Sequence, residues 1–208
     1  MTVFKSLRRA FAPLAFLTAT FTAAPASAAC QSPDGRYCVP SPANLAFNTA
    51  AAQAGDVIID PHAHRLYLVI GPGRVRAYAI AVGRQGDRMP AGDYRIYRKA
   101  DWPDWYPTEE MRIKQNLPEK IAGGPGNPLG AVAMYLQTLA GKDDLYRIHG
   151  TNDPSSIGKS VSHGCIRMLN QDAVELSTLV PVGISIVHVR GQTQQRMPGL
   201  YYGPTGMR

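Results

Sequence analysis

The chain has 208 residues, which is enough for one domain with its own hydrophobic core, or for one domain and a short appendage. Its composition, 45% apolar and 18% charged, excludes a globally disordered chain. The formal net charge of +7 is modest and its basic residues are scattered, which argues against a nucleic-acid partner and suits an anionic polymer.

The first 28 residues have the pattern of a secretory signal peptide. Lys5, Arg8 and Arg9 precede a short apolar run, and Ala26-Ser27-Ala28 fits a small-x-small cleavage site. The apolar run is too short for a stable transmembrane helix, so we expect a mature chain without one; an uncleaved N-terminal anchor is the alternative. Without the three basic residues the net charge falls from +7 to +4.

Three cysteines remain in the exported chain. Cys30 and Cys38 lie close together in the sequence and are disulfide candidates in an oxidising compartment, although Cys30 is also a candidate for lipidation. Their pairing leaves Cys165 as the odd thiol, and an odd thiol in a secreted protein is a candidate reactive group.

Residues 29–54 are expected to form a linker with a short helix. Ser41-Pro42 offers an N-cap and a proline in the first turn, and the helix would run from Ala43 to Ala54. Residues 191–208 are expected to form a flexible tail, which leaves 55–190 as the folded domain.

Short alternating or apolar runs predict strands over most of this domain. The expected strands are 57–59, 65–70, 74–82, 92–97, 131–136, 145–149 and 184–189. Gly71-Pro72-Gly73 predicts a hairpin between the second and third of them. A second helix is predicted over Asn170–Val180, with Asn170 as its N-cap. The fold class is therefore mainly β with one or two short helices.

Residues 99–130 interrupt this pattern with five prolines and no clear periodicity. A stretch of this length is typical of an active-site lid or binding loop, although it would equally well cover an edge of the sheet. We therefore expect it to cap the domain, and Trp105 is its candidate substrate contact.

The chemistry is concentrated around Cys165. His149 ends an apolar strand, Gly164 permits a tight turn and close approach, and Cys165 is expected just before a helix, whose dipole would lower the pKa of the thiol. An imidazole that takes the thiol proton would generate a nucleophile. The backbone amides of residues 163–165 would hold an oxyanion.

His149 and the run Ser162-His163-Gly164-Cys165 resemble the signature of YkuD-type L,D-transpeptidases, in the Gram-negative branch of ErfK, YbiS, YcfS and YnhG. Further similarities are Met89-Pro90-Ala91-Gly92, Trp105-Tyr106-Pro107-Thr108 and Gly126-Asn127-Pro128-Leu129-Gly130. Met89 departs from the usual threonine. Arg167 stands where many members have asparagine, and it fits the Gram-negative branch.

The resemblance implies a fold and a set of roles. The fold would be a YkuD-like β-sandwich of mixed sheets with a long capping loop. The implied roles are nucleophile for Cys165, general acid and base for His149, orientation of the imidazole for the Gly150 carbonyl, lining of the site for Ser162, His163 and Gly164, and substrate binding for Arg167. From the residues alone, His149 and His163 are equal candidates for the base.

The resemblance also implies a substrate, the tetrapeptide stem of peptidoglycan, in the periplasm. The acceptor would be an amine of another stem or of an outer-membrane protein, while water would make the chain an L,D-carboxypeptidase. No metal or organic cofactor is implied, and carbapenems would inactivate the cysteine. Two other classes stay open: a catalytically dead wall-binding module, and a zinc hydrolase that uses His149, His163 and Cys165 with His62 or His64.

Overall fold

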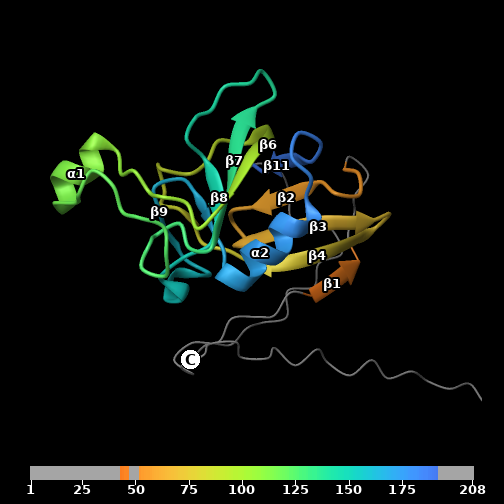
Figure 1. Ribbon diagram of the computed structural model, residues 1–208. Coiled ribbons are helices and arrows are strands. Elements are labelled where there is room, and N and C mark those ends of the chain that lie inside the picture. The colour runs from red at the N-terminus through yellow and green to blue at the C-terminus, as the bar shows by residue number, and fades with distance from the viewer. Residues whose placement is uncertain (1–42, 47–51, 192–208) are drawn as a thin grey trace, which may run out of the picture.

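The structure is a computed structural model that describes residues 43–46 and 52–191 (Figure 1). The strands are β1 (Ala43–Ala46), β2 (Val57–Asp60), β3 (Arg65–Gly71), β4 (Arg74–Ala79), β5 (Val82–Gly83), β6 (Gly92–Asp101), β7 (Val132–Thr138), β8 (Arg147–His149), β9 (Ser160–Ser162), β10 (Ile166–Arg167) and β11 (Ile186–Val189). The helices are α1 (Glu109–Gln115), α2 (Asn170–Leu179) and one 3-10 turn, Pro154–Ser156.

Nine strands form one curled mixed sheet in the order β1-β4-β3-β2-β11-β6-β7-β8-β10, while β5 and β9 form a small separate ladder. Strand β11 pairs parallel with β2, and β10 pairs parallel with β8; the other pairs in the large sheet are antiparallel. The prediction of a mainly β fold with mixed strands and short helices is therefore confirmed.

The main hydrophobic core lies on one face of this sheet. Alternation along β2 and β3 sends Val57, Ile59 and Leu66 into that core, each with 0% exposure. The opposite side chains Ile58 and Tyr67 pack into a second, smaller cluster, so this part of the sheet is buried on both faces. Burial on both faces explains why the β2 segment is continuously apolar in the sequence.

The predicted hairpin is confirmed by the β3–β4 pair. Tyr67 opposes Ala77 in an antiparallel register, and the Gly71-Pro72-Gly73 turn connects the strands. Gly71 and Gly73 have φ angles of 158° and 65°; the second lies in the left-handed region that favours glycine. Local turn chemistry is thus sufficient to set this part of the fold.

The helix predicted over Ala43–Ala54 is wrong. Ala43–Ala46 form strand β1, which pairs antiparallel with β4, and residues 52–56 form a turn. An alanine-rich segment has high helix propensity but little side chain to bury, so its backbone is stabilised more by pairing with the open edge of β4.

The segment that follows β6 is only partly irregular. It contains α1, which begins after the N-cap Thr108, whose hydroxyl accepts a hydrogen bond from Met111 N at 3.3 Å, and ends at Asn116 in a left-handed conformation. Helix α1 has no buried residue and stands away from the sheet at one end of the molecule (Figure 1). Short helices with strong caps are hard to separate from loops in a proline-rich sequence.

Helix α2 begins at Asn170, one residue earlier than predicted. Its N-cap is Leu169 rather than Asn170, and its buried residues Ala173 and Leu176 join the main core. In the part of the chain that the structure describes, no helix has the length and apolar character needed to cross a membrane. The predicted signal peptide, the Cys30–Cys38 pair and the tail beyond residue 191 lie outside the described residues.

Candidate active site

The candidate site is built on the parallel pair β8–β10 at the end of the large sheet. Ile166 opposes Ile148, and Arg167 opposes His149. The two isoleucines point into the core with 1% and 0% exposure. Because side chains alternate across a strand, His149 and Arg167 share the other face, and Cys165, two residues before Arg167, lies on that face as well.

A cavity of about 380 Å³ opens on this face. The predicted residues that line it are Trp105, His149, Ser162, His163, Cys165 and Arg167. The turn before β8 and the segment around α1 supply the rest of the lining, including Tyr106, Leu129 and Tyr146. The thiol and the imidazole that the sequence singled out are thus brought to one cavity from positions sixteen residues apart.

The His149 imidazole is buried at 4% exposure and has a defined orientation. Its Nδ1 lies 2.6 Å from the Gly150 carbonyl oxygen. A carbonyl can only accept, so Nδ1 carries the hydrogen and Nε2 keeps its lone pair as an acceptor. Burial, reinforced by the positive charge of Arg167, lowers the pKa of His149 to about 4, although the Gly150 carbonyl opposes this shift. The ring is therefore a neutral base at physiological pH.

The Cys165 thiol is half-buried, and its Sγ lies 3.8 Å from the Leu145 carbonyl oxygen. Burial raises the pKa of the thiol, while the backbone N–H of Arg147 and the charges of Arg147 and Arg167 partly offset that rise. The expectation of a helix start that lowers the pKa is wrong, because Cys165 enters strand β10 and α2 begins only at Asn170. At rest the thiol and the imidazole that line this cavity are both neutral.

Ser162 and Gly164 shape the turn that presents the sulfur. Ser162 Oγ donates to the Cys165 carbonyl at 2.6 Å and accepts from Gly164 N at 3.1 Å. Gly164 has a φ of 113°, and a Cβ there would lie 2.9 Å from both the Asp87 carbonyl oxygen and a ring carbon of Tyr146. Only glycine fits this turn, as the sequence suggested.

His163 occupies a different environment from His149. Its side chain is exposed at the rim of the cavity, with Nε2 3.5 Å from a guanidinium nitrogen of Arg84. The His163 ring is exposed and its Nε2 faces the Arg84 guanidinium, whereas the buried His149 ring is oriented by the Gly150 carbonyl with Nε2 as its acceptor. The geometry therefore favours His149 among the two candidates that the sequence left open.

A search against protein-family models matches residues 54–189 to the L,D-transpeptidase catalytic domain, YkuD. The chain belongs to this family. The match covers more than half of the sequence and includes every residue that lines the cavity.

Named relatives agree with this assignment. The putative L,D-transpeptidase YkuD of Bacillus licheniformis is 35% identical over 147 residues, which cover 69% of this chain and 81% of that protein. The probable L,D-transpeptidase YbiS of Escherichia coli strain K12 is 35% identical over 137 residues, 62% of this chain and 43% of that protein. The chain thus spans less than half the length of YbiS.

A solved structure supports the fold. The Ldtfm–avibactam carbamoyl enzyme is 20% identical, covers 67% of this chain and 49% of that chain, and superimposes with a TM-score of 0.50. At this identity the likeness extends to the fold of the L,D-transpeptidase domain.

Sequence reasoning missed the role of Asn170 in this domain. Its Oδ1 accepts hydrogen bonds from Ala131 N and Thr151 N, each at 3.0 Å, and so joins the ends of β7 and β8. A Cβ at Gly150 or Gly130 would lie 2.1 Å from that oxygen, so both positions must be glycine for the amide to enter. The paired glycines were the available signal for this contact.

Asn127 braces the capping segment from within, because its side-chain partners Ile121, Ala122 and Leu129 all belong to that segment. This side chain is 1% exposed, donates to the carbonyls of Ile121 and Ala122, and accepts from Leu129 N at 2.8 Å. Trp105 is held on the same segment by a backbone bridge to Ile121. Residues of this segment line the cavity and so form one wall of it, while its role as a lid or binding loop stays a prediction.

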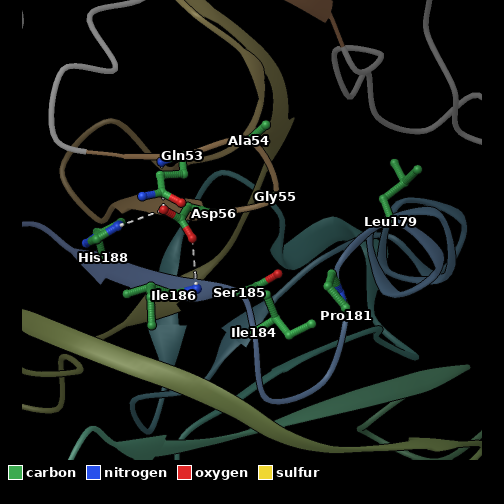
Figure 2. A pocket seen from close by; sticks show the side chains of 10 residues that line it. All are labelled: Gln53, Ala54, Gly55, Asp56, Leu179, Pro181, Ile184, Ser185, Ile186 and His188. Atoms are coloured by element: carbon green, nitrogen blue, oxygen red, sulfur yellow. Dashed lines mark hydrogen bonds and ion pairs between the residues drawn. The ribbon is translucent and has the colours of Figure 1, made fainter.

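A second cavity, of about 520 Å³, is larger but lies elsewhere, between β2, β11 and the end of α2 (Figure 2). Its Asp56 carboxylate accepts from Ile186 N at 3.0 Å and from Gln53 N at 2.8 Å, and Nε2 of His188 lies 3.6 Å from the same carboxylate. These hydrogen bonds tie β11 to the turn before β2, and no cysteine is among the residues that line this cavity. We therefore place the chemistry in the smaller cavity.

The zinc alternative requires several donors to converge. Over residues 43–46 and 52–191, no three His, Cys, Asp or Glu side chains gather closely enough to hold a metal ion. His64 instead pairs with Ser160 Oγ at 3.0 Å, and His62 Nδ1 lies 3.3 Å from Arg88. The additional donors that the sequence offered for zinc, His62 and His64, therefore have other partners.

Proposed function

We propose that this domain is a cysteine-dependent peptidoglycan L,D-transpeptidase, with Cys165 as the acyl carrier and His149 as the group that moves the protons. The observation that carries the proposal is the shared cavity of the thiol and an imidazole whose Nδ1 is fixed by the Gly150 carbonyl at 2.6 Å. The family and the names of its relatives support the reaction class.

The first half-reaction begins with two neutral groups. Cys165 Sγ attacks the carbonyl carbon of the third residue of a tetrapeptide stem, a diamino acid, while its proton passes to Nε2 of His149. The C–N bond to the terminal D-alanine then breaks, and the same proton is delivered to the leaving nitrogen. The products are free D-alanine and a thioester on Cys165.

The second half-reaction returns the thiol. An acceptor amine attacks the thioester carbon and gives a proton to His149, the C–S bond breaks, and the sulfur recovers a proton from the imidazolium. The developing oxyanion needs fixed donors in both halves. Since the Gly164 amide is already bonded to Ser162 Oγ, we assign that role to the amides of His163 and Cys165.

Arg167 and Trp105 are assigned to substrate binding. The Arg167 guanidinium lies on the same strand face as the thiol and is half-buried, so it offers an anchor for a stem carboxylate. Trp105 and Tyr106 present aromatic surface on the capping wall, where an extended peptide would lie. The proposed location is the periplasm, on the pattern of residues 1–28, and the acceptor is a stem amine or an outer-membrane protein.

The decisive experiment is incubation of the purified chain with tetrapeptide muropeptides, followed by mass spectrometry. Cys165→Ala should abolish all products while its thermal melt stays close to that of the wild type. A Cys30→Ser, Cys38→Ser double variant, which removes the other two thiols, should remain active. Activity that survives in Cys165→Ala would refute the proposal.

The products also separate the related functions. Cross-linked dimers indicate transfer to a stem amine, and tripeptides alone indicate an L,D-carboxypeptidase. A parallel incubation with a carbapenem should add its mass to the peptide that contains Cys165. A folded chain that forms neither products nor this adduct would be a wall-binding module.

A further inference from the structure

The turn before the catalytic strand contains an unusual backbone conformation. Residues 138–142 close a tight turn, with Thr138 N donating to the Lys142 carbonyl at 2.8 Å. Leu145 then adopts a φ of 64°, in the left-handed region that a leucine rarely enters. Its side chain is 64% exposed, so burial does not compensate for the conformation. Another interaction must hold it.

Asp143 supplies that interaction. Its Oδ1 accepts from Leu145 N at 2.8 Å and from an Arg147 guanidinium nitrogen at 2.7 Å. Its Oδ2 accepts from the second Arg147 nitrogen at 3.0 Å and from the Tyr97 hydroxyl at 2.7 Å. The Arg147 guanidinium in turn lies over the Tyr135 ring, 4.5 Å from its centroid. A carboxylate with four donors has one orientation, and it fixes the Leu145 peptide with it.

The Leu145 carbonyl is the group that this arrangement points at the active site. Its oxygen lies 3.8 Å from Cys165 Sγ and accepts the thiol hydrogen. The thiol hydrogen therefore points to the Leu145 carbonyl and not to the Nε2 lone pair of His149. Leu145 also lines the cavity, so a substrate that enters it meets this residue.

We propose that Asp143 is a positioning residue: it holds the Leu145 carbonyl against the Cys165 thiol and keeps the thiol protonated until substrate binds. This inference rests on the proposed function of Cys165 as the nucleophile. Substrate in the cavity displaces the Leu145 contact, and the thiol hydrogen then turns to His149.

Burial, the largest influence, and the Asp143 carboxylate both raise the pKa of the Cys165 thiol. The guanidinium groups of Arg147 on β8 and Arg167 on β10 lower it. A hydrogen bond from the neutral thiol to a carbonyl also favours the protonated form. Loss of the Asp143 contacts should therefore make the thiol easier to ionise.

The test is the rate at which iodoacetamide alkylates Cys165, followed by peptide mass spectrometry of the full chain from pH 6 to pH 10. Asp143→Asn removes the charge and disrupts the bond to Leu145 N. Asp143→Glu keeps the charge but moves the carboxylate by one methylene. Both variants should be alkylated about fivefold faster at pH 7, which corresponds to about 1 kcal/mol, and should converge with the wild type at high pH.

Tyr97→Phe is the matched control. It removes one hydrogen bond to the same carboxylate and leaves the charge and the Leu145 contact in place. It should lower the melting temperature without changing the alkylation profile. The proposal would be overturned if folded Asp143→Asn and Asp143→Glu both showed the wild-type alkylation profile. A wild-type alkylation profile in Asp143→Glu alone would also overturn it, because that result assigns the effect to charge and not to position.

Alkylation needs only an accessible sulfur. Its outcome is therefore independent of the muropeptide assay, and a failure of the positioning proposal is distinguishable from a failure of the proposed transpeptidase function. If Asp143→Asn does not fold, the comparison of Asp143→Glu with Tyr97→Phe decides the question.

Discussion

Replacement of Asn170 by alanine should loosen the catalytic strand from its neighbour. The side-chain oxygen is the acceptor for Ala131 N and Thr151 N, and Thr151 is 1% exposed while Ala131 is 9% exposed. Water cannot readily replace the lost acceptor, so both N–H groups would be left without partners. Thr151 follows Gly150, whose carbonyl orients the His149 ring, so we expect both stability and catalysis to decline.

The magnitude follows from the number of orphaned groups. A buried donor without a partner costs about 1–3 kcal/mol, so two cost about 2–6 kcal/mol. Alanine is the better helix former at the start of α2, which offsets about 0.5 kcal/mol. For a domain of this size the net loss should lower the melting temperature by about 10 °C. Misplacement of the imidazole should reduce kcat by about tenfold to a hundredfold.

Two further variants make this measurement specific. Asn152→Ala removes an exposed amide that makes one bond to the Gly126 carbonyl, and should change stability by about 0.5 kcal/mol or less. Asn170→Asp retains an acceptor oxygen at a helix N-terminus, and should recover most of the lost stability and activity. Thermal unfolding and muropeptide turnover are the readouts. An aspartate variant no better than the alanine variant would refute the reasoning.

Two other predictions concern pH. Since the pKa of His149 lies at about 4, the imidazole stays a neutral base down to that pH, and the acid limb of kcat/KM should fall near pH 4; a limb near 6.5 would contradict the burial argument. Burial and the nearby Glu175 raise the pKa of Asp172 to about 6, and its Oδ2 has no hydrogen-bond partner. Folding therefore favours the protonated carboxyl, and the stability of the domain declines as pH rises from about 4 to 6. Asp172→Asn should therefore stabilise the domain by about 2 kcal/mol at pH 7 in urea unfolding, and the gain should vanish below pH 4; an equal gain at both pH values would point to another cause.

The sequence was informative where short-range chemistry decides the structure. Gly71-Pro72-Gly73 lies between two alternating runs, and a hairpin results. The parallel partners β8 and β10 were not predictable in this way, because their register depends on how Ile148 and Ile166 fill the core. For the same reason the short strand Ile166–Arg167 was not predicted, and Cys165 was expected to lie directly before the helix.

The residues of the candidate site likewise fall into those that local sequence chemistry indicates and those that it does not. Cys165 and His149 were found because thiol and imidazole chemistry restricts the residue types, and Gly164 because a tight turn requires glycine. Asn170 and Asp143 act on backbone amides, and the amides of Ala131 and Thr151 are distant from residue 170 in sequence. A polar side chain that serves distant amides leaves no local pattern; only the crowding at Gly150 hinted at it.

The pairing of β8 with β10 has a consequence for how such domains diversify. Because two core isoleucines set the alignment of these strands, residues 152–161 of the connection between them do not determine where the thiol and the ring lie. Insertions or deletions within that connection can reshape the entrance for different acceptors while the reacting atoms keep their places. Selection for new partners and selection for catalysis can thus proceed on separate parts of the chain.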